Sequence, residues 1–148
     1  MKFVIYHGTS MKNALNILDN REFISQSKIN HWLGNGVYFF VNDPDAAEWW
    51  GNMKSPDDGA VMSAEIELDE SEILDLDTLT GANVLNEFYD LWNDLNSDLE
   101  FPLETIRFIK DNPSQAKHVQ MSIVLDLIFE MYGYKACMYS FVIERLQV

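Results

Sequence analysis

An alternation of apolar and polar side chains runs from Val61 to Leu68. Successive side chains of a β-strand point to opposite faces, so this alternation predicts a strand with one face buried and one face in water. The apolar parity consists of Met62, Ala64, Ile66 and Leu68. The fold must therefore supply other elements that cover one side of this strand.

Short runs of β-forming residues and stretches of helical periodicity surround this strand. The further predicted strands are Phe3–Tyr6, Gly34–Val41, Ile73–Leu76 and Lys135–Leu146. The predicted helices are Met11–Asn20, Asp45–Trp50, Asn83–Leu95 and Met121–Tyr132. Asn42-Asp43-Pro44 favours a helix start, because a short polar side chain accepts bonds from free amides and proline fits the first turn. This order of elements predicts an α+β fold with helices segregated around a small sheet.

The length and the apolar content predict one domain over residues 1–148. The chain has 148 residues, of which 47% are hydrophobic, and a chain of this size can bury most of its apolar surface in one core. No internal repeat, low-complexity tract or linker interrupts it. We expect bulky aromatic residues, among them Trp49, Trp50 and Phe88, to fill the core.

The charge is strongly acidic. Ten Lys and Arg against 24 Asp and Glu give a formal net charge of −14, which repels nucleic-acid phosphates and anionic lipid. A nucleic-acid site would have to be a local exception. The apolar stretch Met121–Tyr132 is well short of the roughly 20 residues that span a bilayer, so we expect no membrane association.

The cysteine and histidine content argues against a disulfide or a metal site. Cys137 is the single cysteine, and the three histidines are scattered without the paired spacings of zinc ligands. We expect a reducing compartment, no bound metal, and Cys137 as a small buried apolar side chain. The apolar run before His7 is too short for a signal peptide, so the expected location is cytoplasmic.

Two motifs carry the candidate chemistry. One is Tyr6-His7-Gly8-Thr9-Ser10 at the end of the first strand, and the other is the segment from Gly34 to Phe40, Gly-Asn-Gly-Val-Tyr-Phe-Phe. Alone, the first also fits a turn with a solvated histidine and a helix cap, and the second also fits a tight turn before a core strand. The glycine pair lacks the third glycine and the following helix of a dinucleotide-binding fingerprint.

Together, and in this order, the two motifs resemble those of the ADP-ribosyltransferase superfamily, in its diphtheria-toxin and PARP-like branch. That branch carries a His-Gly-[Ser/Thr] element on its first strand and a Gly-x-Gly-[Ile/Val]-Tyr-Phe element on its second. The resemblance covers about the first half of the chain well and the second half only in its order of elements. It implies an ADP-ribosyltransferase-like fold, in which two small antiparallel half-sheets with flanking helices form a cleft for NAD.

The resemblance also implies roles for individual residues. The backbone of Gly8 would bond the nicotinamide amide, the side chain of His7 would contact the adenosine-ribose hydroxyls, and Tyr38 would stack on the nicotinamide ring. The residues that would bind NAD are His7, Gly8, Thr9, Ser10, Gly36, Tyr38 and Ser140.

The third element of the family's His-Tyr-Glu signature departs from the pattern. The family has a glutamate near the start of its last strand, which holds a ribose hydroxyl and stabilises the positive charge of the transition state. Here the matching position is Ser140. Glu144 shares strand parity with Ser140 and is the substitute we expect, so the catalytic set is His7, Tyr38 and Glu144; the alternative is that Glu144 is a solvated charge near the C-terminus.

The resemblance implies a glycosyltransferase that cleaves the nicotinamide–ribose bond of NAD and transfers ADP-ribose to a macromolecular acceptor, a protein or a nucleic acid. With water as acceptor the same chemistry is NAD hydrolysis. A bacterial or phage conflict toxin, with a neutralising partner protein, is a common setting for the family. The rival expectation is a non-catalytic interaction protein on the same fold, whose acidic surface binds a basic partner.

Overall fold

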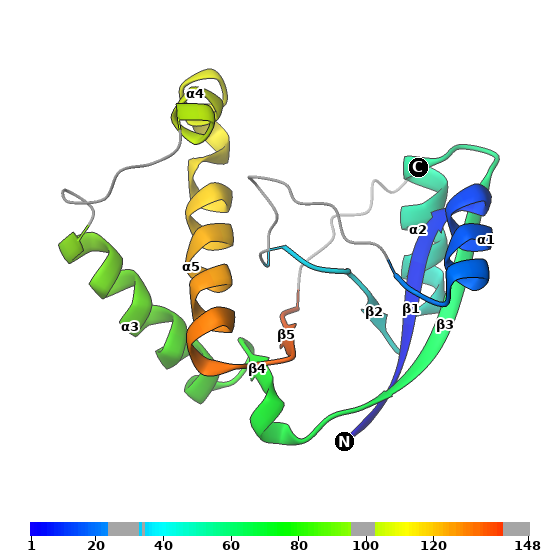
Figure 1. The fold of residues 1–148 in the computed structure, drawn as a ribbon, viewed down its shortest axis with the longest axis horizontal. Helices are drawn as coiled ribbons and strands as arrows, with labels where there is room; N and C mark the ends of the chain where they lie inside the picture. The colour runs from blue at the N-terminus through cyan, green and yellow to red at the C-terminus, as the bar shows by residue number, and fades with distance from the viewer. Residues whose placement is uncertain (24–32, 34, 96–102, 141–148) are drawn as a thin grey trace, which may run out of the picture. The chain divides into compact units, whose positions relative to one another are not determined.

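A computed structural model describes residues 1–23, 33, 35–95 and 103–140 (Figure 1). The strands are β1 (Lys2–Ser10), β2 (Phe40–Val41), β3 (Gly59–Glu67), β4 (Ile73–Asp75) and β5 (Ala136–Met138). The helices are α1 (Met11–Asn20), α2 (Pro44–Lys54), α3 (Leu79–Leu95), α4 (Leu103–Asp111) and α5 (Ala116–Tyr132), with 3₁₀ turns at Glu70–Glu72 and Pro113–Gln115. The predicted α+β class is confirmed.

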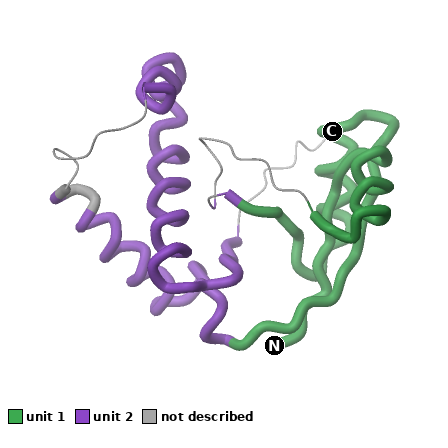
Figure 2. Tube along the Cα trace, viewed as in Figure 1, with its two compact units in different colours: residues 1–27, 36–69 green, residues 28–35, 70–148 purple. Residues whose placement is uncertain are grey.

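The chain divides into two compact units (Figure 2). Unit 1 comprises Met1–Ser27 and Gly36–Asp69, and unit 2 comprises Lys28–Asn35 and Glu70–Val148. The chain therefore passes between the units before the second motif segment, again within it between Asn35 and Gly36, and a third time after Asp69.

Unit 1 contains a three-stranded antiparallel sheet in the order β2-β1-β3. β3 pairs with β1 along its whole length, and the alternation predicted for Val61–Leu68 is confirmed, because exposed and less exposed residues alternate through the strand. The predicted second strand, Gly34–Val41, is wrong in its start. Among the residues of this segment that the structure describes, 35–41, only Phe40 and Val41 pair with β1, and the carbonyl of Tyr38 accepts a bond from the side chain of His7 instead.

Helix α1 has the predicted bounds, since it begins at Met11 and ends at Asn20. The side chain of Ser10 accepts a hydrogen bond from the backbone N–H of Asn13, at 3.1 Å, as an N-cap. Ala14 and Ile17 form its buried side.

Helix α2 lies against the sheet through small residues. The Asp43 side chain caps it by accepting a bond from the N–H of Ala46, as predicted, but the helix continues to Lys54. Its buried residues are Ala46, Ala47 and Gly51. The prediction that Trp49 and Trp50 fill the core is wrong, because they are 44% and 38% exposed. A helix this close to a sheet has room only for small side chains on the side that faces it.

Unit 2 has a core built from α3, α5 and β4. The core residues are Leu74, Leu76, Phe88, Val124, Leu125 and Ile128. Cys137 packs against this core, and burial, with a smaller effect of Asp75, raises the pKa of its thiol to about 12. Cys137 is thus a protonated thiol with apolar neighbours, as predicted, but it is half-buried rather than buried.

The sheet of unit 2 corrects one expectation. β4 and β5 pair in parallel, whereas the family resemblance implies a second antiparallel half-sheet. Parallel neighbours need a long crossover, which the helices α3, α4 and α5 provide. The final strand ends at Met138 rather than continuing to Leu146 as one strand, and positions 141–148 lie outside the described residues. None of the helices in the described ranges is long and apolar enough to cross a membrane.

Candidate functional site

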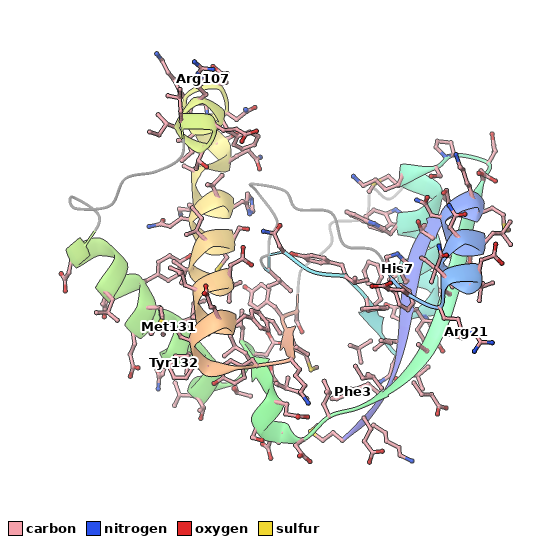
Figure 3. The ribbon with its side chains drawn as sticks, viewed as in Figure 1. Phe3, His7, Arg21, Arg107, Met131 and Tyr132 are labelled. Atoms are coloured by element: carbon pink, nitrogen blue, oxygen red, sulfur yellow. The ribbon has the colours of Figure 1, made fainter. Side chains whose placement is uncertain are left out.

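The imidazole of His7 joins the two motifs. Its Nδ1 lies 2.8 Å from the backbone oxygen of Tyr38. A carbonyl oxygen only accepts, so Nδ1 carries a proton and, in the neutral ring, Nε2 keeps its lone pair. The rings of Phe23 and Phe39 lie 5.4 and 5.5 Å from the imidazole centroid and limit its rotation. Figure 3 labels the His7 side chain on β1.

The structure thus brings together two of the three residues expected to be catalytic. His7 and Tyr38 are 31 residues apart, and both belong to unit 1. The Tyr38 side chain is 38% exposed. A ring with this exposure is not packed away in the core.

Successive residues of β1 direct their backbone N–H and C=O groups alternately toward β3 and toward β2. Met1 and Leu68 exchange two hydrogen bonds, so odd-numbered residues of β1 face β3 with their N–H and C=O groups. The carbonyl of Val4 accepts from the N–H of Asn42, at 2.9 Å, so even-numbered residues face β2.

The backbone groups of Gly8 face the β2 side of β1, beyond the end of β2. Gly8 is even-numbered, and the pairing of β1 with β2 stops at Tyr6 and Phe40. Among the described residues, no strand pairs with β1 beside Gly8 on that side. Its N–H and C=O are therefore not paired with a strand of the described residues on that side, and Gly8 is a buried residue next to His7.

The two motif glycines differ in what surrounds them. A Cβ on Gly8 would overlap the backbone carbonyl of Ala47 in α2, so the close approach of α2 already requires glycine here. A Cβ on Gly36 would meet nothing within 4 Å, and Gly36 does not have a positive φ. Within the part of the chain that the structure describes, neither packing nor backbone conformation requires glycine at position 36.

The hydroxyls of Thr9 and Ser10 are both used at the start of α1. Ser10 caps the helix, and Thr9 Oγ1 accepts from the Asn13 side-chain amide at 3.3 Å. Each hydroxyl accepts in these bonds and retains its proton for donation to a ligand.

Ser140 is held by a carboxylate that the sequence analysis did not single out. Asp77 Oδ1 accepts from the Ser140 N–H at 3.1 Å, and Asp77 Oδ2 accepts from the Ser140 hydroxyl at 2.7 Å. Asp77 is itself fixed, since its N–H donates to Asp75 Oδ1 at 3.0 Å. Because the Ser140 proton goes to Asp77, the Ser140 oxygen is left as an acceptor. No local pattern marks Asp77, since the two residues are 63 positions apart.

The expectation that Glu144 faces the same side as Ser140 assumed that both lie in one strand, and this assumption is wrong. Ser140 follows the end of β5 at Met138 and is not a strand residue. Glu144 lies outside the described residues.

A second side chain missed by the sequence analysis contacts the glycine motif. Asp126 of α5 accepts two hydrogen bonds from Asn35, one from its backbone N–H to Oδ1 and one from its side-chain amide to Oδ2, each 2.9 Å long. Both residues belong to unit 2. The sequence analysis treated this part of the chain only as an apolar helix.

In the ranges that the structure describes, no three His, Cys, Asp or Glu side chains lie close enough together to hold a metal ion.

The chain is similar in sequence to one known protein. No family model matches the chain, and no solved structure matches it. Over 98 residues it is 32% identical to the uncharacterized protein MJ0359 of Methanocaldococcus jannaschii. The aligned region is 63% of this chain and 46% of that protein, so the chain spans about half the length of this relative. A function for the chain therefore has to be inferred from its own residues and their geometry.

Proposed function

We propose that the chain is an NAD-dependent ADP-ribosyltransferase with an ADP-ribosyltransferase-like fold. The observation that carries the proposal is the 2.8 Å contact between His7 Nδ1 and the Tyr38 carbonyl, which joins the two motifs that resemble the family. NAD is the substrate, its nicotinamide–ribose bond is cleaved, and ADP-ribose passes to a protein or nucleic acid, or to water.

The nicotinamide end is recognised by the N–H and C=O of Gly8, which no described strand pairs with on the β2 side. A carboxamide carries one acceptor and one donor group side by side, which matches the N–H and C=O that a strand residue presents to a neighbour. Tyr38 stacks on the ring, and the empty space around Gly36 admits the ligand close to the backbone. Thr9 and Ser10 donate their remaining hydroxyl protons to the same ligand.

His7 binds the adenosine ribose. With Nδ1–H committed to Tyr38, the free Nε2 of the neutral imidazole accepts a hydrogen bond from a ribose hydroxyl. The aromatic contacts with Phe23 and Phe39 hold the ring in this orientation. His7 therefore acts as a fixed acceptor.

The developing positive charge on the ribose needs a carboxylate. Glu144 takes this role in the proposal, and the Ser140 oxygen, made a pure acceptor by Asp77, binds a ribose hydroxyl. Asp77 adds a second negative charge beside that hydroxyl group.

The biological setting follows from the resemblance. A modifying enzyme or conflict toxin that acts in the cytoplasm, controlled by a neutralising partner protein, is the setting that the family offers for this chemistry.

Release of nicotinamide from NAD tests the proposal. The wild-type protein should release nicotinamide, and Glu144→Gln should lower turnover by about 10²–10³ while NAD affinity changes little, since only a charge is lost. Glu65→Gln is the matched control, because Glu65 is an exposed residue of β3. Full turnover in Glu144→Gln would assign the acid's role to Asp77 and Ser140.

One observation favours a second candidate function. The formal net charge of −14 suits a non-catalytic protein that binds a basic partner. A folded wild-type protein that neither binds NAD nor releases nicotinamide would support this function and contradict the enzyme.

A further inference from the structure

We infer that Asp126 is a positioning residue that fixes the segment carrying Tyr38, an inference that rests on the proposed function. The observation is the pair of 2.9 Å hydrogen bonds from Asn35 to the two oxygens of one carboxylate. One bond comes from the backbone and the other from the side chain of Asn35. Two bonds of this kind fix both the position and the rotation of the residue, and each is strengthened by the carboxylate charge.

Asp126 belongs to α5, which has more buried residues than the other helices described in unit 2. The neighbours of Asp126 along α5 include Leu125 and Ile128, which are 0% exposed. The acidic residues of α5 are Asp126 and Glu130. Glu130 is exposed to water, whereas Asp126 is half-buried, and hydrogen bonds offset part of the cost of taking a carboxylate out of water. Asn35 supplies two of them.

A segment of two residues connects Asn35 to Tyr38. Asn35 is bonded to Asp126, and the Tyr38 carbonyl is bonded to His7. Only Gly36 and Val37 lie between these two anchored residues, at the point where the chain passes from unit 2 to unit 1 (Figure 2). The Asn35–Asp126 bonds therefore anchor one end of the segment that carries Tyr38, and their loss removes that anchor.

An exchanged pair tests this inference. Asn35→Asp places two carboxylates against each other, and Asp126→Asn removes the charge and offers an NH₂ group to the Asn35 amide. In the double variant the amide introduced at position 126 accepts from the backbone N–H of position 35 and donates to the carboxylate introduced there. The double variant thus restores both hydrogen bonds with their side-chain polarity reversed.

The expected results are a rise in KM for NAD and a recovery in the double variant. Losing a charge-assisted bond should raise KM by about 10- to 100-fold in Asn35→Asp, with a much smaller effect on kcat, because stacking by Tyr38 acts in the bound ground state. The melting temperature should fall in the same variant, and both quantities should return most of the way in the double variant. Asn16→Asp on α1 and Asp90→Asn on α3 are controls at exposed positions.

Each outcome decides the inference. Unchanged KM in Asn35→Asp, or a double variant as defective as the worse single one, would overturn it. A recovered melting temperature without recovered KM would show a structural contact that does not position Tyr38, and would also overturn it. If the wild type releases no nicotinamide, the proposed function fails and the positioning role fails with it, while the melting temperatures still show whether the hydrogen bonds contribute to stability.

Discussion

The two glycine motifs of the chain meet different physical demands. In β1, Gly8 is needed because α2 approaches so closely that a Cβ would overlap the Ala47 carbonyl. In the second motif, Gly36 has open space around it and no positive φ. Packing explains the glycine at position 8 without a ligand, whereas the described residues give no packing or conformational reason for the glycine at position 36, where we propose that the ligand approaches the backbone. The resemblance assigned both glycines to NAD, and the structure shows a packing reason for Gly8.

The largest expected effect is that of Gly8→Ala. The new methyl group has to displace the backbone of α2, which is far more costly than moving a side-chain end. We expect a loss of about 3 kcal/mol or more in the free energy of unfolding, measured by urea denaturation. Wild-type stability in this variant would contradict the close approach of α2 and would return Gly8 to a role in ligand binding alone.

Tyr38→Ala should weaken NAD binding and leave the fold intact. The lost stacking and hydrogen bonding correspond to about 1–3 kcal/mol in affinity, measured by calorimetry. Little stability should be lost, because the side chain is 38% exposed. Tyr38→Phe keeps the ring and should retain most of the affinity. Equal affinity in wild type and Tyr38→Ala would remove Tyr38 from the site.

Ser10→Ala separates the role of Ser10 as a helix cap from its proposed role in ligand binding. The helix α1 loses its N-cap bond to Asn13, which should lower the free energy of unfolding by about 1 kcal/mol. Ser10→Asp keeps an acceptor at the cap and should restore stability. If NAD affinity stays low in Ser10→Asp although stability returns, the hydroxyl proton of Ser10 binds the ligand; unchanged affinity in both variants would limit Ser10 to capping.

Gly36→Ala should have the smallest effect on folding. Alanine fits without contact and reduces the freedom of the unfolded chain, so stability should stay the same or rise by about 0.4–1 kcal/mol. NAD affinity should fall, because the methyl group occupies space assigned to the ligand. A clear loss of stability would show that the space around Gly36 is needed by the protein itself, and the contrast with Gly8 would disappear.

Part of the candidate site could be predicted from short motifs. His7, Gly8 and Tyr38 were identified as residues of two motifs, and the structure brings His7 and Tyr38 into contact. The side chains that support the site were not predicted. Asp77 bonds Ser140 across 63 positions, and Asp126 bonds Asn35 across 91. An acidic residue in a loop or helix gives no sign of such a partner, because most acidic residues in these places are solvated.

The sequence by itself determined the elements whose causes are local. The bounds of α1, the cap at Asp43 and the alternating faces of β3 follow from interactions within a turn of helix or along one strand.

Only the tertiary structure decided how far β2 pairs with β1, that β4 and β5 are parallel, and that Trp49 and Trp50 are exposed. These features depend on which segments meet after the chain has passed through other elements, and on how closely they approach. Local periodicity contains no information on either quantity, because it reports the faces of one element and not the identity or distance of the neighbour that covers them.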